Sequence, residues 1–225
     1  MTHLIFDASS IITFGMNGLV PELRKLKKIF KGKFLITKEV EWEIVTKPMK
    51  IKRFSLEALR VKKLIEDNVF EFPESVGINS KDVAERTNSL LEIANKTYVS
   101  KEGNVDLIDL GETACIALAK LLKDQGKESV LVIDERTMRS LIETPEDLRR
   151  YLKKKLHSQI TVNKDRVKLF AGLKVIRSCE LVYVLWKKGL AEAKDKQMLD
   201  AMLWAVKLKG CSISDQEIRE VERLR

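Results

Sequence analysis

The sequence has few histidines, cysteines and prolines, and the first two scarcities exclude whole classes of site. Among 225 residues there are two histidines, three cysteines and four prolines. With only His3 and His157 available, catalytic triads that need a histidine are nearly excluded. Cys115, Cys179 and Cys211 lie far apart, without the CxxC or Cys/His spacing of zinc sites, which also argues against a disulfide framework. We expect all three cysteines to be small core residues.

Long apolar runs are missing as well. No run approaches the roughly 18 residues of a membrane span, and the chain does not start with a basic stretch followed by a long apolar segment. We therefore expect a cytoplasmic protein without a signal peptide. Because 44% of the residues are hydrophobic, intrinsic disorder is excluded, and the length suits a single domain over residues 1–225 with a full core.

Charge is abundant and unbalanced. The chain has 42 Lys and Arg residues against 33 Asp and Glu residues, a formal net charge of +9. Such an excess favours a polyanionic partner such as nucleic acid, although a lysine-rich solvated surface explains it equally well.

Short apolar runs alternate with helical patterns along the chain. Strands are predicted at residues 4–6, 34–37, 130–133 and 173–176, with an edge strand at 69–72. This alternation predicts an α/β fold with a mostly parallel central sheet flanked by helices.

Three details are predicted outside those strands. A helix over residues 39–45 should end before Pro48, because the residue before a proline avoids helical geometry. Residues 143–172 are predicted to form an insertion with a helix and a β-hairpin, the hairpin strands being 160–162 and 167–170. Ser214 and Glu217 form a capping box for the last helix.

Acidic residues follow the predicted strands or begin the next helix. They are Asp7; Glu39, Glu41 and Glu43; Asp109 and Glu112; and Asp134 and Glu135. In a parallel sheet these positions converge at the carboxyl ends of the strands, where ligands bind. Crowded carboxylates repel one another unless a cation neutralises them, and oxygen ligands with few histidines suit Mg²⁺ or Mn²⁺.

Each acid also has a purely structural interpretation. Asp7 suits the N-cap of a helix that begins near Ser9, and Asp134 suits the cap of its own following helix. Asp109 and Glu112 have the D-x-x-E spacing of a capping box. Of the three clustered glutamates, residues 39 and 43 share a helix face and residue 41 points elsewhere.

Four segments in this order resemble the PIN-domain family of nucleases. They are Leu4–Ser10, Ile36–Ile44, Leu110–Ala119 and Val130–Arg136. The resemblance is best over residues 1–45 and 105–140 and continues more weakly at 177–189 and 209–214. Each motif alone is short, and their order along the chain carries the resemblance.

The resemblance implies a Mg²⁺- or Mn²⁺-dependent ribonuclease acting on single-stranded or structured RNA. Asp7 matches the first metal-binding acid, Glu43 the second within the V-x-x-E step, and Glu112 the third within G-E. Asp134 matches the fourth, with Glu135 as the alternative. One further position, Ser9, resembles the small hydroxyl residue that orients the first acid and a water.

The resemblance also bears on partners. PIN-like proteins are often homodimers, and some are toxins with an antitoxin partner. The insertion and the long stretch over residues 48–106 exceed a minimal toxin-type member, which leaves the antitoxin open.

Basic and aromatic residues offer further candidates. We predict an RNA contact at the basic helix of the insertion, formed by Arg149, Arg150, Lys153, Lys154 and Lys155. The other basic segments, at residues 24–33 and 47–53, are interpreted as solvated faces. The three tryptophans at 42, 186 and 204 are expected in the core, and His157 at the surface.

Together these patterns predict hydrolysis of RNA phosphodiester bonds by a metal-activated water at a four-carboxylate site. The alternative is a PIN-like nucleic-acid-binding module without activity. A small-molecule phosphohydrolase is disfavoured, because Asp7-Ala8-Ser9 lacks the second Asp of a D-x-D motif and no Gly-rich phosphate loop is present.

Overall fold

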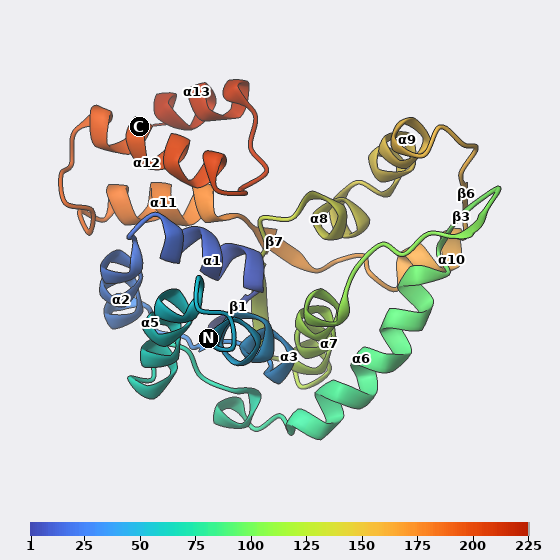
Figure 1. Cartoon of the computed structure of the whole chain (residues 1–225), viewed down its shortest axis with the longest axis horizontal. Helices are drawn as coiled ribbons and strands as arrows, with labels where there is room; N and C mark the ends of the chain where they lie inside the picture. The colour runs from blue at the N-terminus through green and yellow to red at the C-terminus, as the bar shows by residue number, and fades with distance from the viewer. Residues whose placement is uncertain (225) are drawn as a thin grey trace.

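The computed structural model of the protein describes residues 1–224, and its centre is a four-stranded parallel sheet (Figure 1). The strands are β1 (Thr2–Phe6), β2 (Phe34–Leu35), β5 (Glu128–Val132) and β7 (Lys174–Ile176), in the order β2-β1-β5-β7. All neighbours are parallel, with Phe6 opposite Val132 in the central pair. The predicted α/β class is confirmed.

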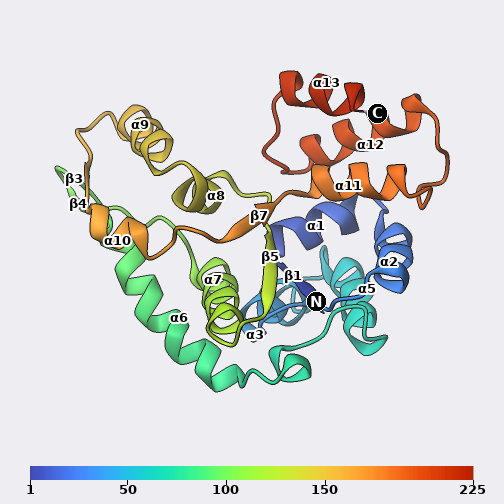
Figure 2. The ribbon, with the colours of Figure 1, turned by 180° about the vertical axis from the view of Figure 1, so that it is seen from behind.

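Helices cover both faces of this sheet. In the first half of the chain the helices are α1 (Ala8–Met16), α2 (Val20–Ile29), α3 (Lys38–Glu41), the π-helix η1 (Trp42–Thr46), α4 (Lys47–Met49), α5 (Ser55–Glu66), the 3₁₀ turn η2 (Pro73–Val76) and α6 (Ser80–Asn95). In the second half they are α7 (Leu110–Asp124), α8 (Arg136–Glu143), α9 (Pro145–Lys155), α10 (Lys164–Lys168), α11 (Ser178–Lys187), α12 (Lys196–Leu208) and α13 (Asp215–Arg223). Figures 1 and 2 show α7 on one side of the sheet and α1 with α11 on the other.

The core is built around the first strand and α7. The centre of the Phe6 ring lies 5.1 Å from the ring centres of both Phe34 and Phe70, and all three rings are fully buried. Small residues along α7, from Ala114 to Ala119, are almost wholly buried, so this helix lies close against β1 and β5. Close helix-to-sheet packing fixes the position of the α7 N-terminus relative to the strand ends.

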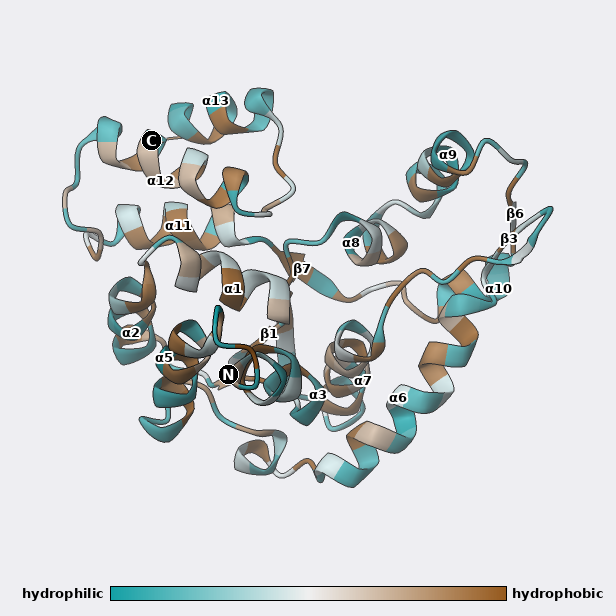
Figure 3. Ribbon diagram, in the orientation of Figure 1, coloured by the Kyte–Doolittle hydropathy of each residue, from teal (hydrophilic) through white to brown (hydrophobic). Residues whose placement is uncertain are grey.

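A second, smaller sheet lies at the side of the molecule. It joins β3 (Tyr98–Ser100), β4 (Gly103–Asn104) and β6 (Thr161–Val162) in the antiparallel order β4-β3-β6. With α6, α9 and α10 it lies on the opposite side of the molecule from α12 and α13 (Figure 1). Hydrophobic and hydrophilic residues alternate along α6, as an amphipathic helix requires (Figure 3).

The predicted hairpin of the insertion is wrong in its second strand. Residues 161–162 are extended, but they pair with Tyr98 and Val99 of β3. The chain then enters α10, because the Asn163 side chain accepts the backbone N–H groups of Asp165 and Arg166 and so caps a helix. The N-K-D-R stretch is therefore a helix start and not a hairpin turn.

Two other local predictions are corrected. The edge strand at residues 69–72 is reduced to a single bridge between Glu71 and Leu35. The helix from residue 38 continues past Pro48 to Met49, because the Lys47 N–H donates to Trp42 O, five residues back, and a new turn starts there. In a first turn the missing N–H of proline is tolerated.

The capping box of the last helix is confirmed. The Glu217 N–H donates to Ser214 Oγ at 3.2 Å, and the Ser214 N–H donates to Glu217 Oε2 at 2.8 Å. Within residues 1–224 no helix has both the length and the apolar character needed to cross a bilayer.

Candidate functional site

The candidate site lies at the carboxyl ends of β1 and β5, where the strand order reverses direction. Asp7 directly follows β1, and its N–H donates to Val132 O of β5 at 3.1 Å. Asp134 follows β5 two residues later. Ligands in open α/β sheets bind at such a switch point, so the predicted location of the acids agrees with the topology.

Asp7 is held by the helix that it caps. Its Oδ2 accepts the Ser9 N–H at 3.1 Å and the Ser9 Oγ–H at 2.6 Å, and the residue is 3% exposed. Burial, with a smaller contribution from the charge of Asp109, raises the pKa of Asp7 to about 6. The hydroxyl of Ser9 also accepts the Asp134 N–H at 3.2 Å, so one serine links both strand ends.

Glu43 reaches the site from the π-helix η1, a conformation that is rare and often found at functional sites. Its carboxylate accepts the backbone N–H of Gly111 at the start of α7. A Cβ on Gly111 would lie 2.6 Å from Glu43 Oε1, so only glycine permits this approach. Burial, followed by the charges of Asp109 and Asp7, raises the pKa of Glu43 to about 7.

Glu112 and Asp109 form the predicted capping box of α7. The Glu112 N–H donates to Asp109 Oδ1 at 2.9 Å, and the Asp109 N–H donates to Glu112 Oε2 at 3.0 Å. Glu112 is 9% exposed; burial and then the charges of Asp7 and Asp109 raise its pKa to about 9. The predicted capping box is therefore confirmed, and Glu112 also lies within range of the charges of Asp7 and Asp109.

The two acids after β5 differ in their surroundings. Asp134 is completely buried, and its oxygens accept the Ser178 N–H and Oγ–H, both at 2.7 Å. Glu135 caps α8 through Met138 N at 2.9 Å, and its charge contributes to the raised pKa of Glu112. The cap predicted for Asp134 is thus made by Glu135, and Asp134 joins the end of β5 to the start of α11.

The carboxylates of Asp7, Glu43 and Glu112, which we call the acidic cluster, have no paired cation. Within residues 1–224 no Lys or Arg forms an ion pair with these three side chains, and the charge of Lys47 only partly offsets the raised pKa of Glu43. Over the same residues, no three His, Cys, Asp or Glu side chains converge closely enough to make a ready-made metal centre. With pKa values of about 7 and 9, Glu43 in part and Glu112 almost wholly hold a proton at neutral pH, which a bound cation would displace.

The basic helix α9 of the insertion is partly neutralised by its own acids. Arg149 pairs with Glu146 at 2.8 Å, and Arg150 pairs with Asp147. The remaining cations of the predicted RNA contact, Lys153, Lys154 and Lys155, are exposed. The contact stays a prediction, with its charge concentrated in the last turn of α9.

The other residues singled out by the sequence have mixed outcomes. The three cysteines are buried and His157 is exposed, as predicted. Trp186 and Trp204 are partly buried against the core, but Trp42 is 50% exposed and its core prediction is wrong. Trp42 is exposed because it belongs to the π-helix η1, whose buried residues are Ile44 and Val45.

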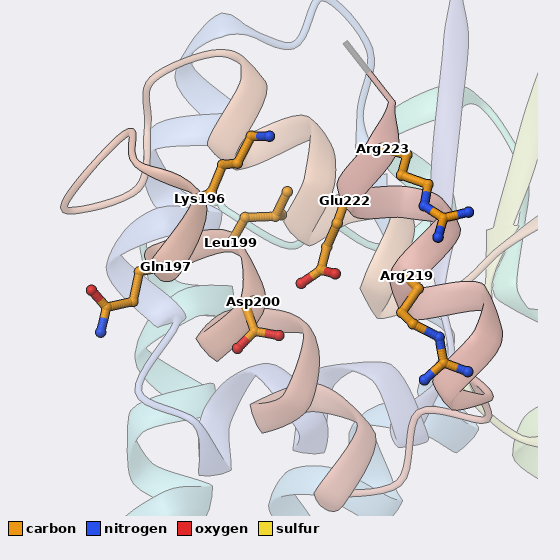
Figure 4. A pocket seen from close by; sticks show the side chains of 7 residues that line it. All are labelled: Lys196, Gln197, Leu199, Asp200, Arg219, Glu222 and Arg223. Carbon is orange, nitrogen blue, oxygen red and sulfur yellow. The ribbon is translucent and has the colours of Figure 1, made fainter.

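A surface cavity of about 520 Å³ lies away from the strand ends, between α12 and α13. Figure 4 shows its lining, with Lys196 and Asp200 on one helix and Arg219 and Glu222 on the other. Opposite charges alternate around it, and none of its lining residues belongs to the acidic cluster.

Comparison with known proteins returns no match. No protein-family model, no curated protein and no solved structure is significantly similar to this chain. The PIN resemblance therefore rests on the sequence motifs alone.

Sequence reasoning did not assign functions to three residues that shape the site. Asp109 was counted among the acids near the strand ends and as a cap but was given no role in the four-carboxylate site, although its charge acts on Asp7, Glu43 and Glu112. The G-E motif could have indicated a close approach at Gly111. Nothing local in the sequence marks Ser178 as the partner of Asp134.

Replacing Ser178 with alanine should destabilise the fold. The Ser178→Ala change removes a buried hydrogen bond to the carboxyl of Asp134, which costs about 1.5–3 kcal/mol for a charged acceptor. Thermal unfolding should show a lower Tm. The matched control is Ser75→Ala, an exposed serine, which should change stability by about 0.5 kcal/mol or less. Equal Tm values for both variants would contradict the structural link.

Replacing Gly111 with alanine should displace Glu43 without unfolding the protein. The new methyl group meets only the end of a flexible side chain, and alanine favours a helix over glycine by about 1 kcal/mol. We expect a native-like Tm and a fall in the pKa of Glu43 toward its ordinary value, measured by NMR of labelled carboxyl carbons. Gly15→Ala, with open space around its Cβ position, should leave that pKa unchanged.

Proposed function

We propose that this protein is a divalent-metal-dependent ribonuclease of the PIN type, which hydrolyses RNA phosphodiester bonds. The observation that supports this most strongly is the acidic cluster. Three carboxylates from β1–α1, η1 and α7 lie at the switch point of the sheet without a paired cation among residues 1–224, and burial, followed by the charges of nearby acids, raises the pKa of each. Burying acids in this way costs the protein stability, so a cation-dependent function is the simplest reason for it.

The donor chemistry of the cluster suits Mg²⁺ or Mn²⁺, which prefer carboxylate oxygens. Asp7, Glu43 and Glu112 would hold the ion, with Asp134 or Glu135 as the fourth acid. Of these two, Glu135 is favoured by its charge acting on Glu112, because both oxygens of Asp134 already accept bonds from Ser178. When bound, the metal supplies a water of lowered pKa and offsets charge on the phosphate.

The chain's own groups orient these acids. Ser9 fixes Asp7 through Oδ2, and the capping box fixes one oxygen of Glu112. The Gly111 N–H holds Glu43 at the positive end of the α7 dipole, which favours its ionised form. Each carboxylate is thus restrained at one point and keeps acceptor capacity for a ligand.

The basic exterior suits a polyanionic substrate. With a net charge of +9, the protein attracts RNA over long range, whereas the acidic cluster alone would repel it. The exposed lysines at the end of α9 remain the proposed contact for the RNA backbone.

A second candidate function is a PIN-like module that binds nucleic acid without cleaving it. One specific observation favours it: within residues 1–224 the acids do not converge into a ready-made metal centre. Cleavage would require these side chains to move together when the ion binds.

The test of the proposal is cleavage of labelled single-stranded and hairpin RNAs in Mn²⁺ and in chelator. We expect Mn²⁺-dependent products, and a loss of rate of about a hundredfold or more for Asp7→Asn, which removes a negative ligand. Asp165→Asn, an exposed acid on α10, is the matched control and should cleave normally. Binding without cleavage would support the inactive module, and neither binding nor cleavage would refute both functions.

Stability should fall as the pH rises, and Mn²⁺ should reverse this. The folded-state pKa values of about 6, 7 and 9 lie above the ordinary values of 3.8 and 4.5. The folded state therefore binds more protons than the unfolded state, and its stability decreases between about pH 4 and pH 9. A divalent cation that replaces those protons should raise the Tm more at about pH 8 than at about pH 5.5.

The matched variants for this pH effect are Glu112→Gln and Glu102→Gln. The first keeps an oxygen for the capping box but removes a carboxyl that the folded protein must keep protonated at about pH 8, so it should raise the metal-free Tm at that pH by a few degrees. The second changes an exposed glutamate in the β3–β4 turn and should leave the pH dependence of the Tm unchanged. A Tm of Glu112→Gln that falls below that of the native protein at high pH would contradict the raised pKa.

A further inference from the structure

The segment that follows Glu43 combines exposed aromatic rings with positive charge. Trp42 is 50% exposed and Phe54 is 46% exposed. Between Glu43 and Glu57 the sequence contains four cations and no acid; the cations are Lys47, Lys50, Lys52 and Arg53. All four are exposed, and within residues 1–224 none forms an ion pair.

Two of these cations lie against the two rings. The Lys47 ammonium is 5.5 Å from the centre of the Trp42 ring, and the Arg53 guanidinium is 5.3 Å from the centre of the Phe54 ring. Trp42 and Lys47 belong to η1 and α4, Arg53 and Phe54 lie in the turn that leads into α5, and these three helices pack on one another. We call this surface, formed by Trp42, Lys47, Arg53 and Phe54, the aromatic–basic platform.

The platform lies next to the acidic cluster, and Lys47 interacts with both. The charge of Lys47, which lies by Trp42, also acts on the Glu43 carboxyl. Trp42 and Glu43 are neighbours on the same π-helix. A chain that lies across the platform would therefore lead directly to the carboxylates.

Charge and ring chemistry identify the occupant. A second copy of this protein in a symmetric dimer would bring two sets of four cations together, which costs free energy. An RNA strand offers phosphates for the cations and the π-faces of its bases for the rings. Grooves that bind single strands combine these two features, and the stacking needs unpaired bases.

We propose that the aromatic–basic platform binds single-stranded RNA beside the scissile site, with a base stacked on Trp42 and a phosphate at Lys47. This rests on the proposed function for its substrate, and it narrows that substrate to RNA that is unpaired next to the cleavage site. Trp42 contributes binding and not chemistry.

The test measures binding in chelator, where no cleavage occurs, with a labelled single-stranded RNA of about ten nucleotides and a duplex of the same length. Trp42→Ala should weaken single-strand binding by about tenfold or more, and Trp42→Phe should restore most of it because a ring remains. Duplex binding should change little. Leu208→Ala, an exposed apolar residue at the end of α12, is the control and should bind both RNAs normally.

Two further readouts separate the platform from a structural effect. The single strand should quench tryptophan fluorescence in the native protein and less in Trp42→Phe. In the Mn²⁺ cleavage assay Trp42→Ala should raise KM with little change in kcat. Lys47→Gln should weaken binding and lower the slope of affinity against salt by about one phosphate contact.

The failures of the two proposals are distinguishable. Native single-strand affinity in Trp42→Ala would overturn the platform, while Mn²⁺-dependent cleavage that is lost in Asp7→Asn would still support the ribonuclease. Trp42-dependent binding without any cleavage would overturn the ribonuclease and leave the platform as that of a binding module. Trp42-dependent dimerisation, or binding to anionic phospholipid vesicles in place of RNA, would also overturn the platform.

Discussion

The burial of carboxylates beside other acids is the constraint on which the proposed chemistry depends. Asp7, Glu43 and Glu112 are each partly or wholly removed from water, and each experiences the charges of neighbouring acids. Lys47 offsets this only at Glu43. Folding removes these groups from water because β1, η1 and α7 pack together, and this desolvation, increased by the charges of nearby acids, is an energetic cost of that packing. A bound cation would convert this cost into affinity.

The helix α7 is central to this arrangement. Its small residues let it lie close to β1 and β5, so its N-terminus reaches the strand ends. There the capping box, the Gly111 N–H and the helix dipole hold acidic groups that would otherwise repel one another. One helix start thus supplies an acidic side chain, a hydrogen-bond donor and a positive partial charge within a few residues.

The two basic surfaces proposed to contact RNA differ in how their charge is balanced. The insertion helix α9 presents lysines but pairs its arginines with its own acids. The segment after η1 presents cations and rings without any nearby acid. From the sequence, the basic helix α9 was predicted to contact RNA and the segment over residues 47–53 was not. A run of basic residues can be recognised in the sequence, whereas the exposure of a tryptophan cannot.

The sequence by itself determined the four strands of the central sheet, the α/β class and the capping boxes of α7 and α13, because these follow from local periodicity and from spacings of three or four residues. It also placed Asp7, Glu43, Glu112 and Asp134 at strand ends or helix starts. The tertiary structure alone decided that Asp109 charges the cluster, that Ser178 holds Asp134, that Trp42 is exposed and that residues 161–162 pair with β3. Those outcomes depend on contacts between segments distant in the chain and on which face of a helix is covered, and neither is set by local sequence.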